Sequence, residues 1–185
     1  MNIFPVVNLP EKMYIETRRL KIQPLTEAQL KLYALNDGSL EKELGLRYSP
    51  KAIEPDLADA LETYFLRLIP QHPEHFFFYT LWAIELKSEQ TLAGDLCFKG
   101  DPDENGEVEI GYGTYPEFQQ QGIMSEAIEG LLHWCAQRSD INTVLAETEN
   151  GNTASEKILE RNGFIKDCQG RDNTWWKREV KELVM

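Results

Sequence analysis

The residues best placed to do chemistry lie in one polar turn, from Phe118 to Ser125. The turn follows a strand-like run, Glu107 to Tyr115, and Gly122 stands directly before an amphipathic helical pattern. At such a junction several backbone N–H groups have no intrahelical partner, and the helix dipole makes that end positive. The segment therefore predicts a site for a phosphate-bearing cofactor.

Two carboxylates upstream of this turn are candidates for acid–base chemistry. Glu107 and Glu109 are two positions apart on the predicted strand, so their side chains share one face. Gly111 and Gly113 continue that face and leave space above the strand. We expect Glu109 to act as a general base, with Glu107 beside the substrate. The alternative is a pair of solvated carboxylates at a sheet edge.

Three ordered motifs resemble the GNAT N-acetyltransferases, and most closely the branch that includes the ribosomal-protein N-terminal acetyltransferases. The segment from Gln119 to Ala127 is similar to the family's acetyl-coenzyme A loop. The segment from Asn152 to Phe164 resembles a later helix that ends in Gly-Phe, and the run from Thr17 to Ile22 resembles the first strand. The resemblance implies the GNAT fold, N-acetylation, and acetyl-coenzyme A as co-substrate.

The resemblance also implies which residues hold acetyl-coenzyme A. The backbone of Tyr112 and Thr114 would bind the pantetheine arm as an added strand, and Asn152 would contact that arm while capping its helix. Gln120 stands where the family commonly has glycine, which is unfavourable if its backbone is left-handed. The loop residues implied to bind the pyrophosphate are Phe118, Gln119, Gln120, Gln121, Gly122, Ile123, Met124 and Ser125.

Many GNAT enzymes use a tyrosine of the later helix to protonate the departing thiolate, and Leu159 occupies that position here. The resemblance suggests Ser155 as a substitute, and the alternative is an ordinary first-turn serine.

An α-amino group with a pKa near 7.8 is about a quarter neutral at pH 7.4, whereas a lysine near 10.4 is neutral at about one part in a thousand. A base such as Glu109 is therefore essential for a lysine acceptor and only helpful for a protein N-terminus. Trp82 is expected to form an aromatic wall of the acceptor site.

Predicted strands and helices alternate irregularly along the chain that must position these residues. This order predicts an α/β fold with a mixed, mostly antiparallel central sheet of about six to seven strands and helices on both faces. Residues 1–14 are expected to form an N-terminal arm, and residues 15–180 a single domain. Strands are expected over residues 19–24, 77–86, 91–99, 107–115, 143–148, 164–168 and 173–180, and helices over 27–35, 54–69, 123–137 and 152–162.

The amino-acid composition and net charge argue against several kinds of function. A chain of 185 residues with 42% hydrophobic and 27% charged residues suits one globular domain. The net charge of −12 argues against nucleic-acid or anionic-membrane binding and is compatible with an amine acceptor. No signal-peptide pattern is present, so we expect a cytoplasmic location. The three cysteines and three histidines show no metal-ligand spacing, so no metal is expected.

The leading hypothesis is an N-acetyltransferase that moves an acetyl group directly from acetyl-coenzyme A to a primary amine, either a protein N-terminus or a small amine. We expect a monomer or a homodimer. The alternative is a non-catalytic acyl-coenzyme A sensor or scaffold, suggested by Leu159 and Gln120. A weaker alternative is a nucleotide- or sugar-phosphate-binding protein that shares only the turn.

Overall fold

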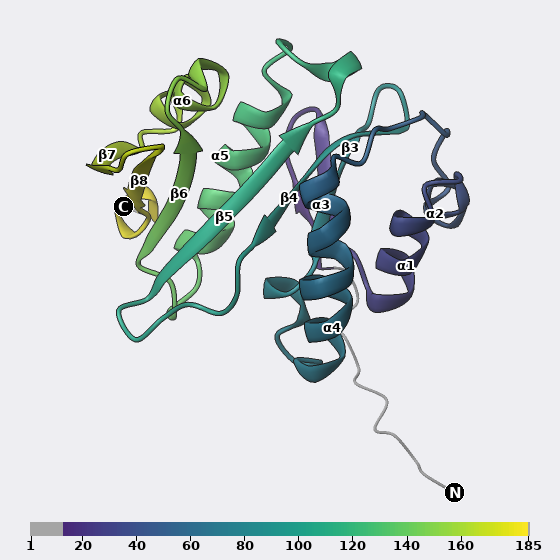
Figure 1. Cartoon of the computed structure of the whole chain (residues 1–185), viewed down its shortest axis with the longest axis horizontal. Coiled ribbons are helices and arrows are strands. Elements are labelled where there is room, and N and C mark those ends of the chain that lie inside the picture. Colours follow the sequence, from purple (N-terminus) through teal and green to yellow (C-terminus); the bar gives the residue numbers. More distant parts are fainter. Residues whose placement is uncertain (1–12, 185) are drawn as a thin grey trace, which may run out of the picture.

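The computed structural model describes residues 13–184, which form one eight-stranded sheet with helices on both faces (Figure 1). The strand order is β1-β2-β3-β4-β5-β6-β8-β7, and only β5 and β6 pair in parallel. The predicted mixed, mostly antiparallel sheet is confirmed, with more strands than expected. Most of the predicted arm, residues 1–12, lies outside the described residues. The strands are β1 (Ile15–Glu16), β2 (Leu20–Pro24), β3 (Leu81–Leu86), β4 (Thr91–Phe98), β5 (Glu107–Thr114), β6 (Thr143–Glu149), β7 (Ile165–Gln169) and β8 (Asn173–Glu179).

The four predicted helices are present in the predicted order, but the helix over Ser39–Leu44 was not predicted, and one predicted helix is divided into shorter pieces. The predicted helix over residues 54–69 is two short α-helices joined by a π-helical turn, Leu61–Phe65. The helices are α1 (Glu27–Leu35), α2 (Ser39–Leu44), α3 (Pro55–Ala60), α4 (Leu66–Leu68), α5 (Ile123–Ala136) and α6 (Thr153–Arg161), and short 3₁₀ turns cover Ile69–Gln71, Phe76–Phe78, Pro116–Phe118 and Lys181–Val184.

Local sequence signals explain where two of these helices begin and end. Thr26 caps α1 in a full capping box with Gln29, which satisfies N–H groups at both positions. Helix α6 ends at Arg161, and Gly163 follows its C-cap with a φ of 75°, which suits glycine. The N–H of Phe164 then donates to the carbonyl oxygen of Leu159 at 3.1 Å, and both side chains are buried. This is the Schellman-type stop that the Asn-Gly-Phe sequence predicts.

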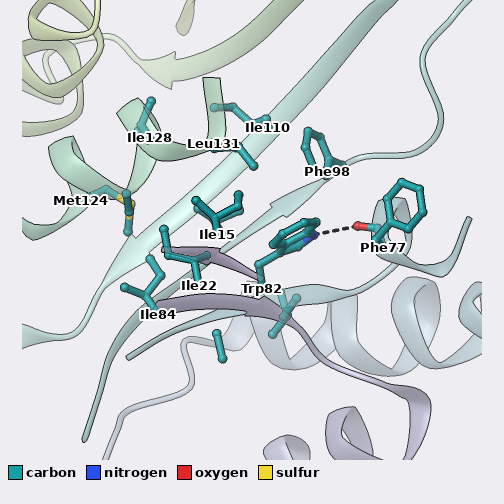
Figure 2. Close-up of a cluster of buried hydrophobic side chains, with 14 of the residues drawn as sticks. Ile15, Ile22, Phe77, Trp82, Ile84, Phe98, Ile110, Met124, Ile128 and Leu131 are labelled. Carbon is teal, nitrogen blue, oxygen red and sulfur yellow. Dashed lines mark hydrogen bonds between the residues drawn. The ribbon is translucent and has the colours of Figure 1, made fainter. Parts of the chain in front are cut away.

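One layer of the core lies between the sheet and α5, which is seen behind β5 in Figure 1. Figure 2 shows Ile22, Ile110 and Ile128 pointing into this layer from β2, β5 and α5. Their burial removes apolar surface from water, which is the main favourable term in folding. The packing fixes α5 against β5, and so fixes the turn between them.

Trp82 belongs to this core, in contrast to the expected role at the acceptor site. Its side chain is 0% exposed, and its Nε1 donates to the carbonyl oxygen of Phe77 at 2.8 Å (Figure 2). Its ring packs edge-on against Phe98 and Trp134. The predicted strand from residue 77 also starts later, at Leu81, because Phe76–Phe78 forms a 3₁₀ turn. We therefore do not retain Trp82 as an aromatic wall for the acceptor.

Candidate functional site

Strands β5 and β6 separate part-way along their length. Their parallel pairing begins at Glu107 with Thr143 and ends at Ile110 with Ala146. Beyond that point β5 stays paired with β4 as far as Thr114, while β6 continues beside β8. One edge of β5 is therefore open from Gly111 onward.

The hydrogen bonds to β4 show which backbone groups face this opening. Lys99 N donates to Glu109 O at 2.9 Å, and Tyr115 N donates to Ala93 O at 3.0 Å. Because alternate residues of an antiparallel strand bond to the same neighbour, the intervening Tyr112 and Thr114 direct their N–H and C=O groups toward the opening. These are the two residues implied above to bind a pantetheine arm as an added strand.

The turn after β5 collects unpaired N–H groups at one point. Gly122 is the N-cap of α5 with a φ of 72°, and no side chain caps it. The helical ladder begins where the N–H of Glu126 donates to Gly122 O. In the part of the chain that the structure describes, the N–H groups of residues 120–125 have no hydrogen-bond acceptor. They form a cradle at the positive end of a 14-residue helix, which suits a diphosphate.

Gln120, which stands where glycine is expected, has an unfavourable backbone conformation. Its φ is 60°, in the left-handed region that glycine adopts more easily than any other residue. Holding a glutamine there costs on the order of 1 kcal/mol. The neighbouring glutamines bond to the turn itself: Gln119 Nε2 donates to Thr114 O, and Gln121 Nε2 donates to Glu117 O.

A contact that the sequence did not reveal ties the cradle to the first strands. Arg19 Nε lies 2.5 Å from Glu126 Oε2, and Arg19 Nη1 donates to Gln121 O at 3.0 Å. Glu126 Oε1 also accepts from Thr17 Oγ1 and from the Arg19 N–H. Burial raises the pKa of Glu126, but these hydrogen bonds outweigh it and the net pKa is lowered. The ionised carboxylate thus stays in place at the start of α5.

A cavity of about 360 Å³ opens between this cradle and α6. Lys157 and Arg161, one turn apart on α6, line it opposite Gly122. Neither cation forms an ion pair within residues 13–184. They can receive further phosphate charge, and sequence reasoning missed them. Their i,i+4 spacing was the available signal, but it does not show which way the pair faces.

A larger groove, about 730 Å³, runs along β1 and the outer side of α5. It shares Gly122, Ser125 and Arg161 with the smaller cavity. The smaller cavity is the better candidate for the phosphate site because it is lined both by the cradle and by the two cations of α6. Ser125 also accepts a hydrogen bond from Asn162 Nδ2 at 3.2 Å, which links the two helices.

The base candidate Glu109 lies on the face of β5 that looks away from α5. Its carboxylate forms an ion pair with Lys99, whose Nζ also lies 4.0 Å from Glu147 Oε2. The side chain of Glu109 is 22% exposed, but its Oε1, which faces Lys99, is buried. Glu107 is half-buried at the start of the same strand. The structure places both carboxylates on one face, as the alternation of the sequence predicts.

The acid candidate Ser155 lies on the other side of the sheet, at the third position of α6. Its N–H donates to Asn152 Oδ1 at 3.2 Å, so Asn152 caps the helix as predicted. The carbonyl oxygen of Ser155 accepts from the hydroxyl of Tyr112 at 3.4 Å. Leu159, one turn later, is completely buried. The two proposed catalytic side chains therefore flank the open edge of β5 from opposite faces.

Within residues 13–184 there is no group of three or more metal-binding side chains, and no helix is long and apolar enough to cross a membrane.

Comparison with protein families gives a match to the acetyltransferase (GNAT) domain over residues 19–165. Among curated proteins, the N-acetyltransferase YjdG of Bacillus subtilis, whose role is uncharacterised, is 30% identical over 162 residues, covering 88% of this chain and 95% of that protein. The ribosomal-protein-serine acetyltransferase of Escherichia coli is 34% identical over 77 residues, covering 42% of this chain and 43% of that protein.

Solved structures show the same fold at low sequence identity. A RimL ribosomal L7/L12 α-N-protein acetyltransferase in complex with coenzyme A has a TM-score of 0.65 and 18% identity, covering 91% of this chain and 98% of that one. A ribosomal-protein-S5-alanine acetyltransferase from Vibrio fischeri has a TM-score of 0.68 and 15% identity, covering 92% and 98%.

Proposed function

Because the chain belongs to the GNAT acetyltransferase family, we propose that it transfers an acetyl group from acetyl-coenzyme A directly to a primary amine. The observation that carries this proposal is the combination of two backbone features. The N–H cradle before Ile123 suits a diphosphate, and the open edge of β5 leading to it suits an extended amide-containing arm. Coenzyme A has both groups in that order.

In this proposal the donor lies along the site from α6 to the point where β5 and β6 separate. The pyrophosphate bonds to the N–H groups from Gln120 to Ser125, and the 3′-phosphate lies near Lys157 and Arg161. The pantetheine amides pair with the backbone of Tyr112 and Thr114. An N–H group at the thioester carbonyl stabilises the developing oxyanion, and one such donor is typically worth about 3 kcal/mol.

We propose a protein N-terminal amine as the acceptor. The relative from Escherichia coli is a ribosomal-protein-serine acetyltransferase, and the coenzyme A complex of similar fold is an α-N-protein acetyltransferase. An α-amino group is partly neutral near pH 7.4, so it needs little help to become nucleophilic. In this proposal Glu109, whose side chain is 22% exposed, accepts the proton that the amine loses.

A second candidate is a non-catalytic acyl-coenzyme A sensor. The observation that favours it is the completely buried Leu159 on α6, where the family resemblance leads us to expect a proton-donating tyrosine. Such a protein would bind the donor through the same cradle and release no thiol when amines are added.

An acceptor screen separates these functions. Thiol release from acetyl-coenzyme A is followed with peptides that differ only in a free or blocked N-terminus, with lysine-containing peptides, and with free amino acids and polyamines. Turnover that requires the free N-terminus supports the proposal. Tight coenzyme A binding without turnover on any amine supports the sensor. Calorimetry that shows ATP binding as tightly as coenzyme A would contradict both.

A further inference from the structure

One side chain crosses the open edge of β5. Tyr112 lies two residues beyond Ile110, the last residue of β5 that pairs with β6. Its side chain points to the α6 side of the sheet, and its hydroxyl donates to the carbonyl oxygen of Ser155 at 3.4 Å. Between β5 and α6 this is the one side-chain hydrogen bond in the described part of the chain. The phenol of Tyr112 therefore reaches from β5 to α6 beside the point where β5 and β6 separate.

The Tyr112 hydroxyl keeps its proton and makes only a weak hydrogen bond. Burial raises the pKa of Tyr112 to about 12, and the contact with Ser155 opposes that shift only in part. The hydroxyl consequently keeps its proton throughout the neutral and alkaline range in which amines react. A donor–acceptor distance of 3.4 Å is long for an O–H donor, so the bond is weak and easily exchanged for a better acceptor.

The backbone of the same residue fixes where the reaction must occur. The N–H of Tyr112 is the first one beyond the β5–β6 pairing that is directed toward the opening. If a thioester carbonyl bonds to that N–H, its sulfur lies next to the Tyr112 side chain. We propose, on the basis of the function above, that the Tyr112 hydroxyl protonates the departing sulfur.

The step balances as follows. The amine nitrogen forms a bond to the acetyl carbon, and the electron pair of the C–S bond passes to sulfur as that bond breaks. Sulfur takes the proton of the Tyr112 hydroxyl, which gives the free thiol of coenzyme A. The amine proton leaves on the opposite face, through Glu109, and solvent returns a proton to the phenolate.

Ser155 then has a positioning role. Its N–H is occupied by Asn152, and its carbonyl oxygen orients the Tyr112 hydroxyl before the donor binds. A serine hydroxyl is also a much weaker acid than a phenol, so it transfers a proton to sulfur less readily. The contact with Tyr112 is made by the carbonyl oxygen of Ser155, so it does not depend on the Ser155 side chain.

The test is Tyr112→Phe, with the exposed Tyr48→Phe as the matched control. We expect kcat with acetyl-coenzyme A to fall by about 100-fold, the usual range for loss of a general acid, with the KM for acetyl-coenzyme A within about twofold. With the selenoester analogue the leaving selenolate needs no proton, so the defect should largely disappear. A defect of equal size with thioester and selenoester overturns the proposal, as does an unchanged kcat.

A second measurement does not require turnover. The thiol of bound coenzyme A is titrated by its thiolate absorbance in wild type, Tyr112→Phe and Tyr48→Phe. A hydrogen bond from Tyr112 stabilises the thiolate, so its pKa should be about one unit lower in wild type and Tyr48→Phe than in Tyr112→Phe. Equal values overturn the inference. If no amine is acetylated but this difference is present, the proposed function fails while the contact between Tyr112 and sulfur stands.

Discussion

Arg19 and Glu126 lie 107 residues apart in the sequence, and the Nε of one is 2.5 Å from the Oε2 of the other. This ion pair joins the start of β2 to the first turns of α5. The same guanidinium donates to Gln121 O, so it also holds the turn that precedes the helix. The N–H cradle is therefore held on one side by a residue that lies near the N-terminus in the sequence.

Arg19→Met should weaken coenzyme A binding without unfolding the protein. The substitution keeps the aliphatic stem but removes the bonds to Glu126 and Gln121. Since the arginine side chain is 34% exposed, solvent screening weakens these charged hydrogen bonds, and we expect about a fivefold rise in Kd. Calorimetry measures this, and the exposed neighbour Arg18→Met is the control. Equal affinity in the two variants would show that the cradle keeps its shape without Arg19.

Gly122→Val should reduce coenzyme A affinity at least about tenfold. A β-branched residue at a φ of 72° is strained, and relief of that strain rotates the N–H groups of the turn. Gly45→Val is a matched control because its φ is 71° and no atom would lie within 4 Å of the added Cβ. Both variants should lose similar stability by urea unfolding, but only Gly122→Val should lose affinity. Parallel losses of affinity would remove the loop from the binding site.

Lys157→Ala and Arg161→Ala should each lower coenzyme A affinity about three- to tenfold, as loss of one charged phosphate contact does. Dephospho-coenzyme A, which lacks the 3′-phosphate, should bind the variants and the wild type alike. The preference for coenzyme A over dephospho-coenzyme A is therefore the quantity to measure. Lys42→Ala, an exposed lysine of α2, is the control. If a variant carrying both substitutions prefers coenzyme A over dephospho-coenzyme A as strongly as wild type does, the 3′-phosphate binds elsewhere.

Glu109→Gln should lower kcat for a lysine acceptor about 100-fold, but only about threefold for a free N-terminus, because a base matters most where little amine is neutral. For the same reason the defect should grow as the pH falls. Rate profiles against pH with the two acceptors measure both effects. Glu107→Gln, on the same face two residues earlier, is the control. A Glu109→Gln profile identical to that of wild type would mean that Glu109 does not act as the base.

Asp95 should make the protein less stable as pH rises through the weakly acidic range. Burial raises its pKa from 3.8 to about 6, and the hydrogen bond from Tyr33 at 2.8 Å only partly opposes this. The folded state therefore binds the proton more tightly than the unfolded chain. The associated stabilisation is full below about pH 4 and is lost by about pH 6. In Asp95→Asn this dependence is absent.

Urea unfolding of wild type and Asp95→Asn at about pH 4 and about pH 7.5 tests this sign. The difference in unfolding free energy between the two proteins should move by about 2.4 kcal/mol in favour of wild type at the lower pH. Other carboxylates titrate equally in both proteins and cancel. A difference that does not change with pH would mean that Asp95 remains ionised or is solvated when folded.

The site elements that the sequence predicted are those with local signals. Strand β5, the cradle and helix α5 are consecutive, and the Asn152 cap of α6 depends on residues three positions apart. The contact of Arg19 with Glu126 has no local signal, because it depends on how β2 packs against α5. Trp82 was misplaced because an aromatic residue on a strand looks the same from the sequence whether it faces a pocket or the core.

The short paired segment between β5 and β6 affects how firmly the two parts of the sheet are held together. Within residues 13–184, the main-chain hydrogen bonds that join the five N-terminal strands to the three C-terminal ones are confined to the segment from Gly106 to Ile110. A thioester donor seated in the gap would touch both parts and supply the missing links between them. The co-substrate would then act as a structural member of the fold, and its concentration would set how firmly the two parts hold together.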